Sequence, residues 1–211
     1  MKIELKKTIP DFIKTTVSKK WEKDLVFDTP RKHLVTGSSG SGKTTFLSIL
    51  YGISENYSGE IFFDDKNIRT FTDNTWADIR KQKIAIVFQG LKLFSNLSVL
   101  DNILIKHSLS PYSTKERILN NCSELGIKNL LTRTPLKLSQ GERQRAAIIR
   151  ALTQPFSWLF LDEPFSHLDD KNTQIASALI QKECEERNAG VIITNHKRDK
   201  YFTYANEVSF E

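Results

Sequence analysis

The chain has 211 residues, 39% of them hydrophobic and 27% charged, which suits one soluble domain, and its apolar runs are far shorter than a membrane-spanning helix requires. Two cysteines, Cys122 and Cys184, lie far apart without metal-type spacing, which argues against a disulfide framework or a zinc site. The net charge of +6 comes from scattered basic residues without a recognition-helix or zinc-finger pattern, so we expect no nucleic-acid partner.

Hydrophobic periodicity predicts strands and helices in alternation along the chain. From the N-terminus we expect strands over 2–9, 24–36, 59–65 and 84–88 and a helix over 43–51. Further along we expect helices over 114–125, 142–153 and 170–187 and strands over 157–161 and 191–194. The short, wholly apolar runs are typical of strands that are covered on both faces, so the chain is predicted to be an α/β protein with a mainly parallel sheet. Residues 91–150 lack such a strand and are predicted to form a helical insertion within one domain spanning 1–211.

A glycine-rich loop follows the second predicted strand and precedes the first predicted helix. Its sequence fits the pattern G-x-x-x-x-G-K-[ST], in which backbone N–H groups surround phosphates, the lysine reaches the outer phosphates and the hydroxyl holds Mg²⁺. A flexible Gly/Ser turn is the alternative, and the flanking strand and helix favour nucleotide binding instead. The predicted nucleotide-binding residues here are Gly37, Ser38, Ser39, Gly40, Ser41, Gly42, Lys43, Thr44 and Thr45. This pattern alone does not separate a kinase, a small GTPase, a helicase and a transporter ATPase.

Two acidic residues, Asp162 and Glu163, end the predicted strand over 157–161. The carboxyl ends of parallel strands open into the crevice where such sheets bind ligands. Asp162 is therefore predicted to bind Mg²⁺ together with Thr44, and Glu163 is predicted to polarise or deprotonate an attacking water. A solvated acidic turn is the alternative interpretation, and the phosphate-binding pattern upstream makes it the weaker one.

The segment 138–145, Leu-Ser-Gln-Gly-Glu-Arg-Gln-Arg, resembles the signature sequence of the ATP-binding cassette (ABC) family. Three further marks follow the order of that family: Gln89 resembles the Q-loop glutamine, 166–169 the D-loop and His196 the switch histidine. The resemblance covers roughly residues 32–199. Within the segment, Ser139 and Glu142 have the spacing of a capping box at a helix start, and such a start is also a good anion site.

The resemblance implies a P-loop NTPase core with a small N-terminal antiparallel β part and a helical signature subdomain. It also implies that two cassettes form a head-to-tail homodimer or heterodimer, with each ATP held between one phosphate loop and the other subunit's Ser139, Gly141 and Glu142. In that arrangement His196 contacts the γ-phosphate and holds the attacking water. Gln89 has a catalytic role and contacts Mg²⁺ or that water.

Two features depart from the family pattern. Gln140 replaces the usual first glycine of the signature, and Glu142 stands where glutamine is commonest. The aromatic residue that stacks on adenine is not obvious, and Trp21 is preferred to Phe12 for that role.

The implied function is an ATP-hydrolysing subunit that drives transport through a separate integral membrane permease, with ATP and Mg²⁺ as cofactors. Such a subunit is cytoplasmic and peripheral on the inner face of the cell membrane. Residues 80–102 are most similar to the compact cassettes of lipoprotein-release and macrolide-export systems, whereas 163–166 are closer to small-molecule importers. The alternatives are a non-transport regulator, for example in cell-division signalling through a membrane partner, and a degenerate cassette that binds ATP without hydrolysing it.

Overall fold

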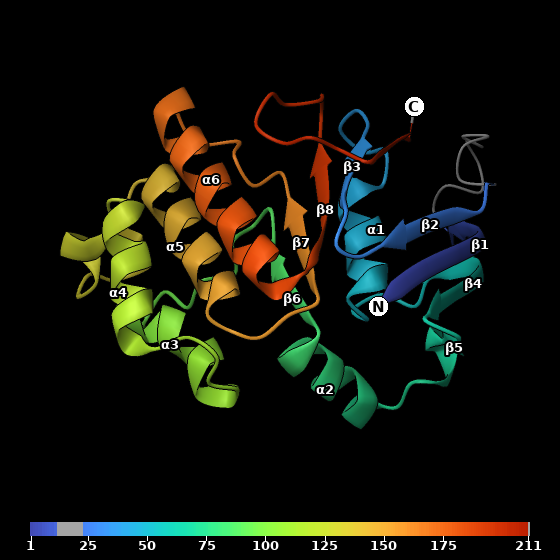
Figure 1. Cartoon of the computed structure of the whole chain (residues 1–211), viewed down its shortest axis with the longest axis horizontal. Coiled ribbons are helices and arrows are strands. Elements are labelled where there is room, and N and C mark those ends of the chain that lie inside the picture. Colours follow the sequence, from blue (N-terminus) through green and yellow to red (C-terminus); the bar gives the residue numbers. More distant parts are fainter. Residues whose placement is uncertain (12–22, 211) are drawn as a thin grey trace.

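The computed structural model describes residues 1–11 and 23–210 and contains two sheets with helices around them (Figure 1). The smaller sheet is antiparallel and has the strand order β2-β1-β4-β5. Its strands are β1 (Lys2–Pro10), β2 (Leu25–Asp28), β4 (Tyr57–Phe63) and β5 (Lys66–Asn67). Buried and exposed residues alternate along much of β1, as expected for a strand with one face on the core. The predicted N-terminal antiparallel part is confirmed.

The larger sheet is parallel throughout its described pairings and has the order β6-β7-β8-β3-β9. Its strands are β3 (Lys32–Thr36), β6 (Ile84–Val87), β7 (Trp158–Asp162), β8 (Gly190–Asn195) and β9 (Asn206–Ser209). Every residue of β6 and β7 is buried, which explains their uninterrupted apolar sequences. The predicted α/β class with a central parallel sheet is confirmed.

In the part of the chain that the structure describes, six α-helices cover this sheet. They are α1 (Lys43–Leu50), α2 (Asp73–Gln82), α3 (Val99–Leu109), α4 (Lys115–Glu124), α5 (Gln140–Leu152) and α6 (Asp170–Arg187). Short 3-10 turns are η2 (Ile68–Thr70), η3 (Lys128–Leu130) and η4 (Pro135–Lys137). Figure 1 shows α3 to α6 on one side of the parallel sheet and α1 on the other, toward the antiparallel sheet. Among the described residues, none of these helices combines the length and the hydropathy that a bilayer span requires.

The strands of the parallel sheet divide their side chains between two hydrophobic cores. Leu159 and Leu161 of β7 pack with α5 and α6, whereas Trp158 and Phe160 of the same strand pack with α1 and the antiparallel sheet. This alternation holds the sheet between two layers and fixes the direction in which the ends of its strands point. Cys122 and Cys184 are both buried free thiols, and burial raises the pKa of Cys122 to about 11 and that of Cys184 to about 12.

Five local elements differ from the prediction. Residues 24–36 form two strands, β2 and β3, which belong to different sheets and are separated by a turn at 29–31. The sequence analysis also missed α2, α3, β5 and β9. In α2 the reason is that only Trp76 is buried among ten residues, which leaves no apolar stripe to detect. The boundaries of α6 agree with the prediction, and those of the other predicted elements differ from it by at most two residues.

Candidate active site

The phosphate loop, residues 37–44, joins the end of β3 to the start of α1. Gly40 and Gly42 have φ angles of 81° and 96°, a left-handed conformation that side chains disfavour, so these glycines allow the chain to turn into the helix. The backbone N–H groups at the start of a helix face outward without helical partners. The local structure therefore has the form of an anion cradle, as the sequence pattern predicts.

Lys43 lies inside the loop and is only 5% exposed. Its ammonium donates hydrogen bonds to the carbonyl oxygens of Gly37 at 2.7 Å and Ser38 at 3.0 Å. It also lies 3.4 Å from the Glu163 Oε1 atom. The positive charge is thus positioned between the loop and the carboxylate, with backbone and ionic contacts that offset the free energy of burying it.

A group of oxygen atoms meets at the start of α1. The Thr44 hydroxyl donates to Asp162 Oδ2 at 2.8 Å and lies 3.4 Å from Gln89 Oε1, and Thr194 donates to the other oxygen of Asp162 at 2.6 Å. Hydroxyl, carboxylate and amide oxygens are ligands that Mg²⁺ accepts, usually with one or two carboxylates and several waters. The donor set therefore fits the predicted magnesium site at Thr44, Asp162 and Gln89.

Glu163 follows β7 in a left-handed conformation, with φ at 48°. Its backbone N–H donates to the Thr194 carbonyl at 3.0 Å, and its carbonyl accepts from Gln144 Nε2 at 3.2 Å, which holds a conformation that is unfavourable for a residue with a Cβ. The carboxylate points toward the phosphate loop. Its Oε2 accepts from Gln89 Nε2 at 3.1 Å and its Oε1 lies 3.3 Å from His196 Nε2.

One cavity of about 210 Å³ brings most of the predicted residues together. It is lined by Ser39, Gly40, Gly42, Lys43, Thr44, Thr45, Gln89, Glu163 and His196. Asp162 is buried beneath it and is reached through Thr44. The predicted adenine-stacking residue Trp21, and its alternative Phe12, lie outside the described residues.

The signature segment, residues 138–145, starts α5 and is not part of that lining among the described residues. Ser139 caps the helix, and the predicted capping box with Glu142 is present. The backbone N–H of Ser139 donates to the Glu142 carboxylate at 2.7 Å, and this hydrogen bond lowers the pKa of Glu142. A Cβ at Gly141 would lie 2.9 Å from the carbonyl oxygen of His167, so this glycine allows α5 to approach the 166–169 loop closely.

Two polar residues of the site were missed by the sequence analysis. Gln144 is buried in α5 and holds the Glu163 carbonyl, and Thr194 is buried at the end of β8 and holds both Asp162 and the Glu163 amide. Thr194 could have been noticed as the polar residue that ends an apolar strand. Gln144 offered no comparable signal, because a glutamine in a polar stretch of helix is usually exposed.

The model of the ABC transporter family matches residues 24–166, about two thirds of the chain. This chain belongs to the ABC transporter family. The predicted likeness to lipoprotein-release cassettes is confirmed by "Lipoprotein-releasing system ATP-binding protein LolD" of Buchnera aphidicola, which is 36% identical over 77% of this chain and 72% of the relative. "Macrolide export ATP-binding/permease protein MacB" of Syntrophobacter fumaroxidans is 33% identical over 76% of this chain, but only 23% of that protein is covered.

The cassette also matches two import cassettes, of which it spans about half the length. Among solved structures, the dimeric MJ0796, a bacterial ABC transporter cassette, superimposes with a TM-score of 0.80 at 26% identity. That alignment covers 92% of this chain and 88% of the solved one. The predicted P-loop cassette fold is thereby confirmed.

Proposed function

We propose that this ABC cassette binds ATP with Mg²⁺, hydrolyses ATP, and uses the cycle to drive transport through a separate membrane subunit. The observation that carries the proposal is the single cavity in which Lys43, Gln89, Glu163 and His196 meet the phosphate loop. The domain is proposed to span 1–211, with residues 91–150 as its helical insertion.

In the proposed reaction, the loop N–H groups and the Lys43 ammonium hold the outer phosphates of ATP. Thr44, Asp162 and Gln89 would hold Mg²⁺, which when bound supplies neutralisation of phosphate charge. The Glu163 carboxylate, whose Oε1 lies 3.4 Å from the Lys43 ammonium, orients the attacking water and accepts its proton. His196, 3.3 Å from Glu163, donates toward the γ-phosphate and orients the same carboxylate.

The proposed active unit contains two cassettes. The Ser139–Glu142 capping box presents a helix N-terminus that the chain's own phosphate cavity does not use, which supports a role toward the ATP of a second cassette. The relation to a dimeric solved cassette is consistent with this arrangement. Ser139, Gly141 and Glu142 are the residues proposed to contact the nucleotide across the dimer.

The proposed membrane subunit is an integral permease, and the cassette is proposed to lie on the cytoplasmic face of the membrane through it. Relatives named for lipoprotein release and macrolide export support this assignment.

The experiment that tests the proposal is light scattering after size-exclusion chromatography on Glu163→Gln, with and without ATP–Mg²⁺. The amide keeps the side-chain volume but cannot accept the proton, so we expect ATP to bind uncleaved and the variant to shift from monomer to dimer. Wild type with ATP–Mg²⁺ is the control, and its hydrolysis should exceed that of the variant at least about 100-fold. A variant that hydrolyses ATP at the wild-type rate would overturn the role of Glu163.

A further inference from the structure

The chain between β8 and β9, residues 197–205, forms a loop that we call the return loop. The Asp199 carboxylate organises it. Its Oδ1 atom accepts hydrogen bonds from the backbone N–H groups of Tyr201 at 2.9 Å and Phe202 at 3.2 Å, and its Oδ2 atom accepts from the Tyr204 hydroxyl. The side chains of Phe202 and Tyr204 are buried. One carboxylate therefore gives the loop a defined conformation.

Aromatic rings join the return loop to the segment that follows Glu163. Figure 1 shows both segments at the end of the parallel sheet where β7 and β8 end. The Phe165 ring stacks on the Phe202 ring, with the centroids 6.0 Å apart and the planes at 17°. The Tyr201 ring meets the same Phe165 ring edge-on at a centroid distance of 6.3 Å. Rings in these arrangements attract each other beyond the effect of the area that they bury, so the loop is packed against a residue two positions after Glu163.

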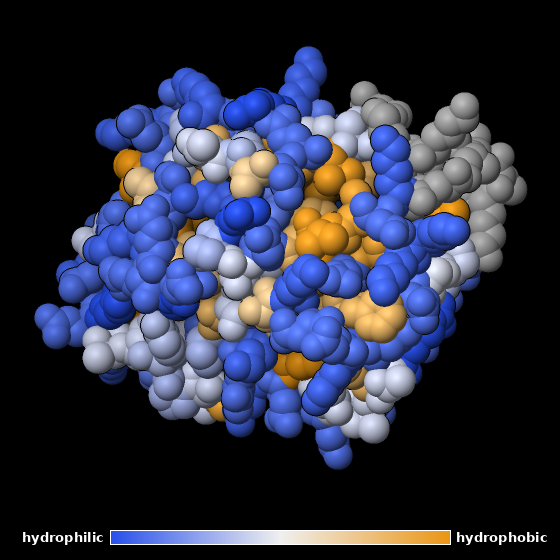
Figure 2. Space-filling model, turned by 45° about the vertical axis from the view of Figure 1, so that its right-hand side comes forward, coloured by the Kyte–Doolittle hydropathy of each residue, from blue (hydrophilic) through white to orange (hydrophobic). Residues whose placement is uncertain are grey.

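Polar contacts also join the return loop to α6. The Tyr201 hydroxyl donates to Asp170 Oδ1, and this hydrogen bond raises the pKa of Tyr201 and lowers that of Asp170. The Lys200 ammonium lies 2.9 Å from the same oxygen, and the Tyr201 carbonyl accepts from Gln181 Nε2 at 3.3 Å. Asp170 and Lys200 are exposed, in keeping with the mainly hydrophilic surface that Figure 2 shows for one face of the molecule. Tyr201 thus contacts its neighbours through its ring, its hydroxyl and its backbone.

His196 lies directly before the return loop and has few contacts of its own. Its side chain is 53% exposed. Within residues 1–11 and 23–210, the ring has one polar contact with another side chain, 3.3 Å between its Nε2 atom and Glu163 Oε1. The backbone on either side therefore determines where the imidazole lies. On one side this backbone belongs to β8, which pairs with β3 and β7, and on the other side it belongs to the return loop.

We propose that Tyr201 is a positioning residue for His196. Its contacts with Phe165 and Asp170 keep the return loop in place, and the loop keeps the imidazole beside Glu163. The inference rests on the proposed function, in which this imidazole and this carboxylate act on ATP and the attacking water. Neither Tyr201 nor Asp170 is among the described residues that line the nucleotide cavity, so losing their contact should slow hydrolysis without weakening ATP binding.

The first test compares kcat for ATP hydrolysis with Kd for ATP–Mg²⁺ in two variants, at a temperature well below the Tm of each. Tyr201→Ala removes the ring and the hydroxyl, and we expect its kcat to fall at least about tenfold, because a displaced reacting group loses much of its effect. Tyr201→Phe keeps the ring, so its kcat should fall only about two- to threefold. In both variants Kd should stay within about twofold of wild type.

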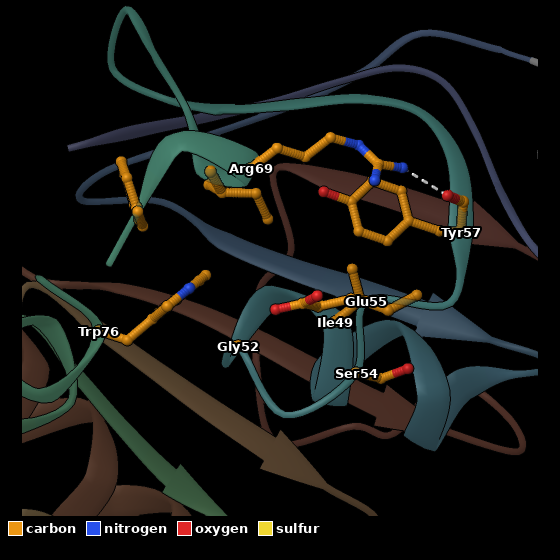
Figure 3. Close-up of a pocket in the computed structure, with 9 residues that line it drawn as sticks. Ile49, Gly52, Ser54, Glu55, Tyr57, Arg69 and Trp76 are labelled. Carbon is orange, nitrogen blue, oxygen red and sulfur yellow. Dashed lines mark hydrogen bonds between the residues drawn. The ribbon is translucent and has the colours of Figure 1, made fainter. Parts of the chain in front are cut away.

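The matched control is Tyr57→Phe, which removes a tyrosine hydroxyl outside the nucleotide cavity. Tyr57 lines a separate cavity of about 100 Å³ beside α1 and α2, where the Arg69 guanidinium lies 4.3 Å from the centroid of its ring (Figure 3). The two cavities have no described lining residue in common. Its kcat and Kd should equal those of wild type within about 1.5-fold. A control that loses as much kcat as Tyr201→Phe would contradict the inference.

The second test observes His196 directly, by NMR of the histidine rings in the nucleotide-free chain. Its resonance is the one that is lost in His196→Ala. Tyr201→Phe keeps the neighbouring ring, so a changed His196 chemical shift reports a moved imidazole. We expect this shift to change in Tyr201→Phe, while the resonances of His33 and His107 stay as in wild type. A His196 resonance that is the same in wild type and in both Tyr201 variants would rule out the positioning role.

The outcomes separate this inference from the proposed function. ATP hydrolysis by wild type with an unchanged kcat in Tyr201→Ala would overturn the inference and leave the proposed function intact. A Kd that weakens as much as kcat falls would assign Tyr201 to the support of the whole nucleotide site, which also overturns the inference. A wild-type chain without ATP hydrolysis would contradict the proposed function, and the inference with it.

Discussion

The two candidate nucleotide-binding segments of this cassette, the phosphate loop and the signature segment, differ in how many side-chain contacts they make with the rest of the chain. The phosphate loop is surrounded: Lys43, Thr44 and the carboxylates of Asp162 and Glu163 contact one another directly or through Gln89. The signature segment has its own helix cap, but Ser139 is exposed and its contacts stay within the first turn of α5. The phosphate loop thus has the contacts of a reaction site, whereas Ser139 of the signature segment lies on the surface. This arrangement is expected if the signature segment completes the site of a second copy.

The two segments are nevertheless joined inside the chain. Gln144, two residues after Glu142, reaches the backbone of Glu163, so a movement of α5 would change the support of the carboxylate that we propose to be catalytic. Under the proposed function, one chain would bind ATP alone, whereas hydrolysis would depend on a second cassette that contacts the start of α5.

The largest effect is expected from a substitution in the phosphate loop. Lys43→Ala removes the cation that faces the phosphates, so ATP affinity should fall at least about 100-fold, equivalent to about 2.7 kcal/mol. Isothermal titration calorimetry with ATP–Mg²⁺ measures this loss. Retained wild-type affinity would contradict the assignment of the phosphate loop.

The next largest effect is expected from a substitution in the signature segment alone. Ser139→Arg places a large cation at the helix start that we propose to face a second cassette, so ATP-dependent dimerisation and hydrolysis should fall at least about tenfold. ATP binding by the monomer should remain within about twofold of wild type, because Ser139 does not line the phosphate cavity among the described residues. Light scattering and a coupled ATPase assay measure the two parts, and unchanged hydrolysis would count against a shared site.

A smaller effect sharpens the role of the supporting residues. Thr194→Val keeps the shape of the side chain but removes the hydroxyl that donates to Asp162 Oδ1. Leaving this buried carboxylate oxygen without its partner should weaken Mg²⁺ binding, so hydrolysis should need a severalfold higher Mg²⁺ concentration. A Mg²⁺ titration of the ATPase rate checks this, with Ser177→Ala on α6 as a buried-hydroxyl control outside the site.

The smallest effect concerns the capping box. Because the pKa of Glu142 is lowered in the folded chain, its contribution to stability is present above the pKa of the unfolded state and is lost as pH falls through the folded pKa. Glu142→Gln should lower the free energy of unfolding by about 0.5 kcal/mol at pH 7, since the hydrogen bond between Glu142 and Ser139 is open to solvent. The difference from wild type should shrink below about pH 4. Urea unfolding at pH 7 and at acid pH measures it; a difference independent of pH would contradict the ionic part of the cap.

Most of the site could be predicted from sequence because its residues occupy fixed positions in local motifs. Lys43 and Thr44 follow a glycine pattern, and Asp162 and Glu163 end an apolar strand, so local chemistry alone identified them. Gln144 could not be found this way, because its partner is a backbone carbonyl that only the tertiary structure brings near.

Contacts between residues distant in sequence also explain why some strands and helices were predicted wrongly. The turn at 29–31 separates β2 from β3, yet apolar residues on both sides made 24–36 resemble one strand. The edge strand β9 is only partly buried and carries no continuous apolar run. Short-range patterns predict elements that are buried on both faces, whereas edges and surface helices depend on neighbours distant in sequence.

The two cysteines have a practical consequence for observing the cassette in motion. Both thiols are buried, and their raised pKa values keep them protonated at neutral pH, so reagents that require a thiolate should modify them slowly. The chain can therefore be labelled at an introduced cysteine while its two native thiols react little with the dye. A cysteine introduced at an exposed position such as Lys128 would carry a dye selectively, and opening and closing could be followed by energy transfer without removing either native thiol.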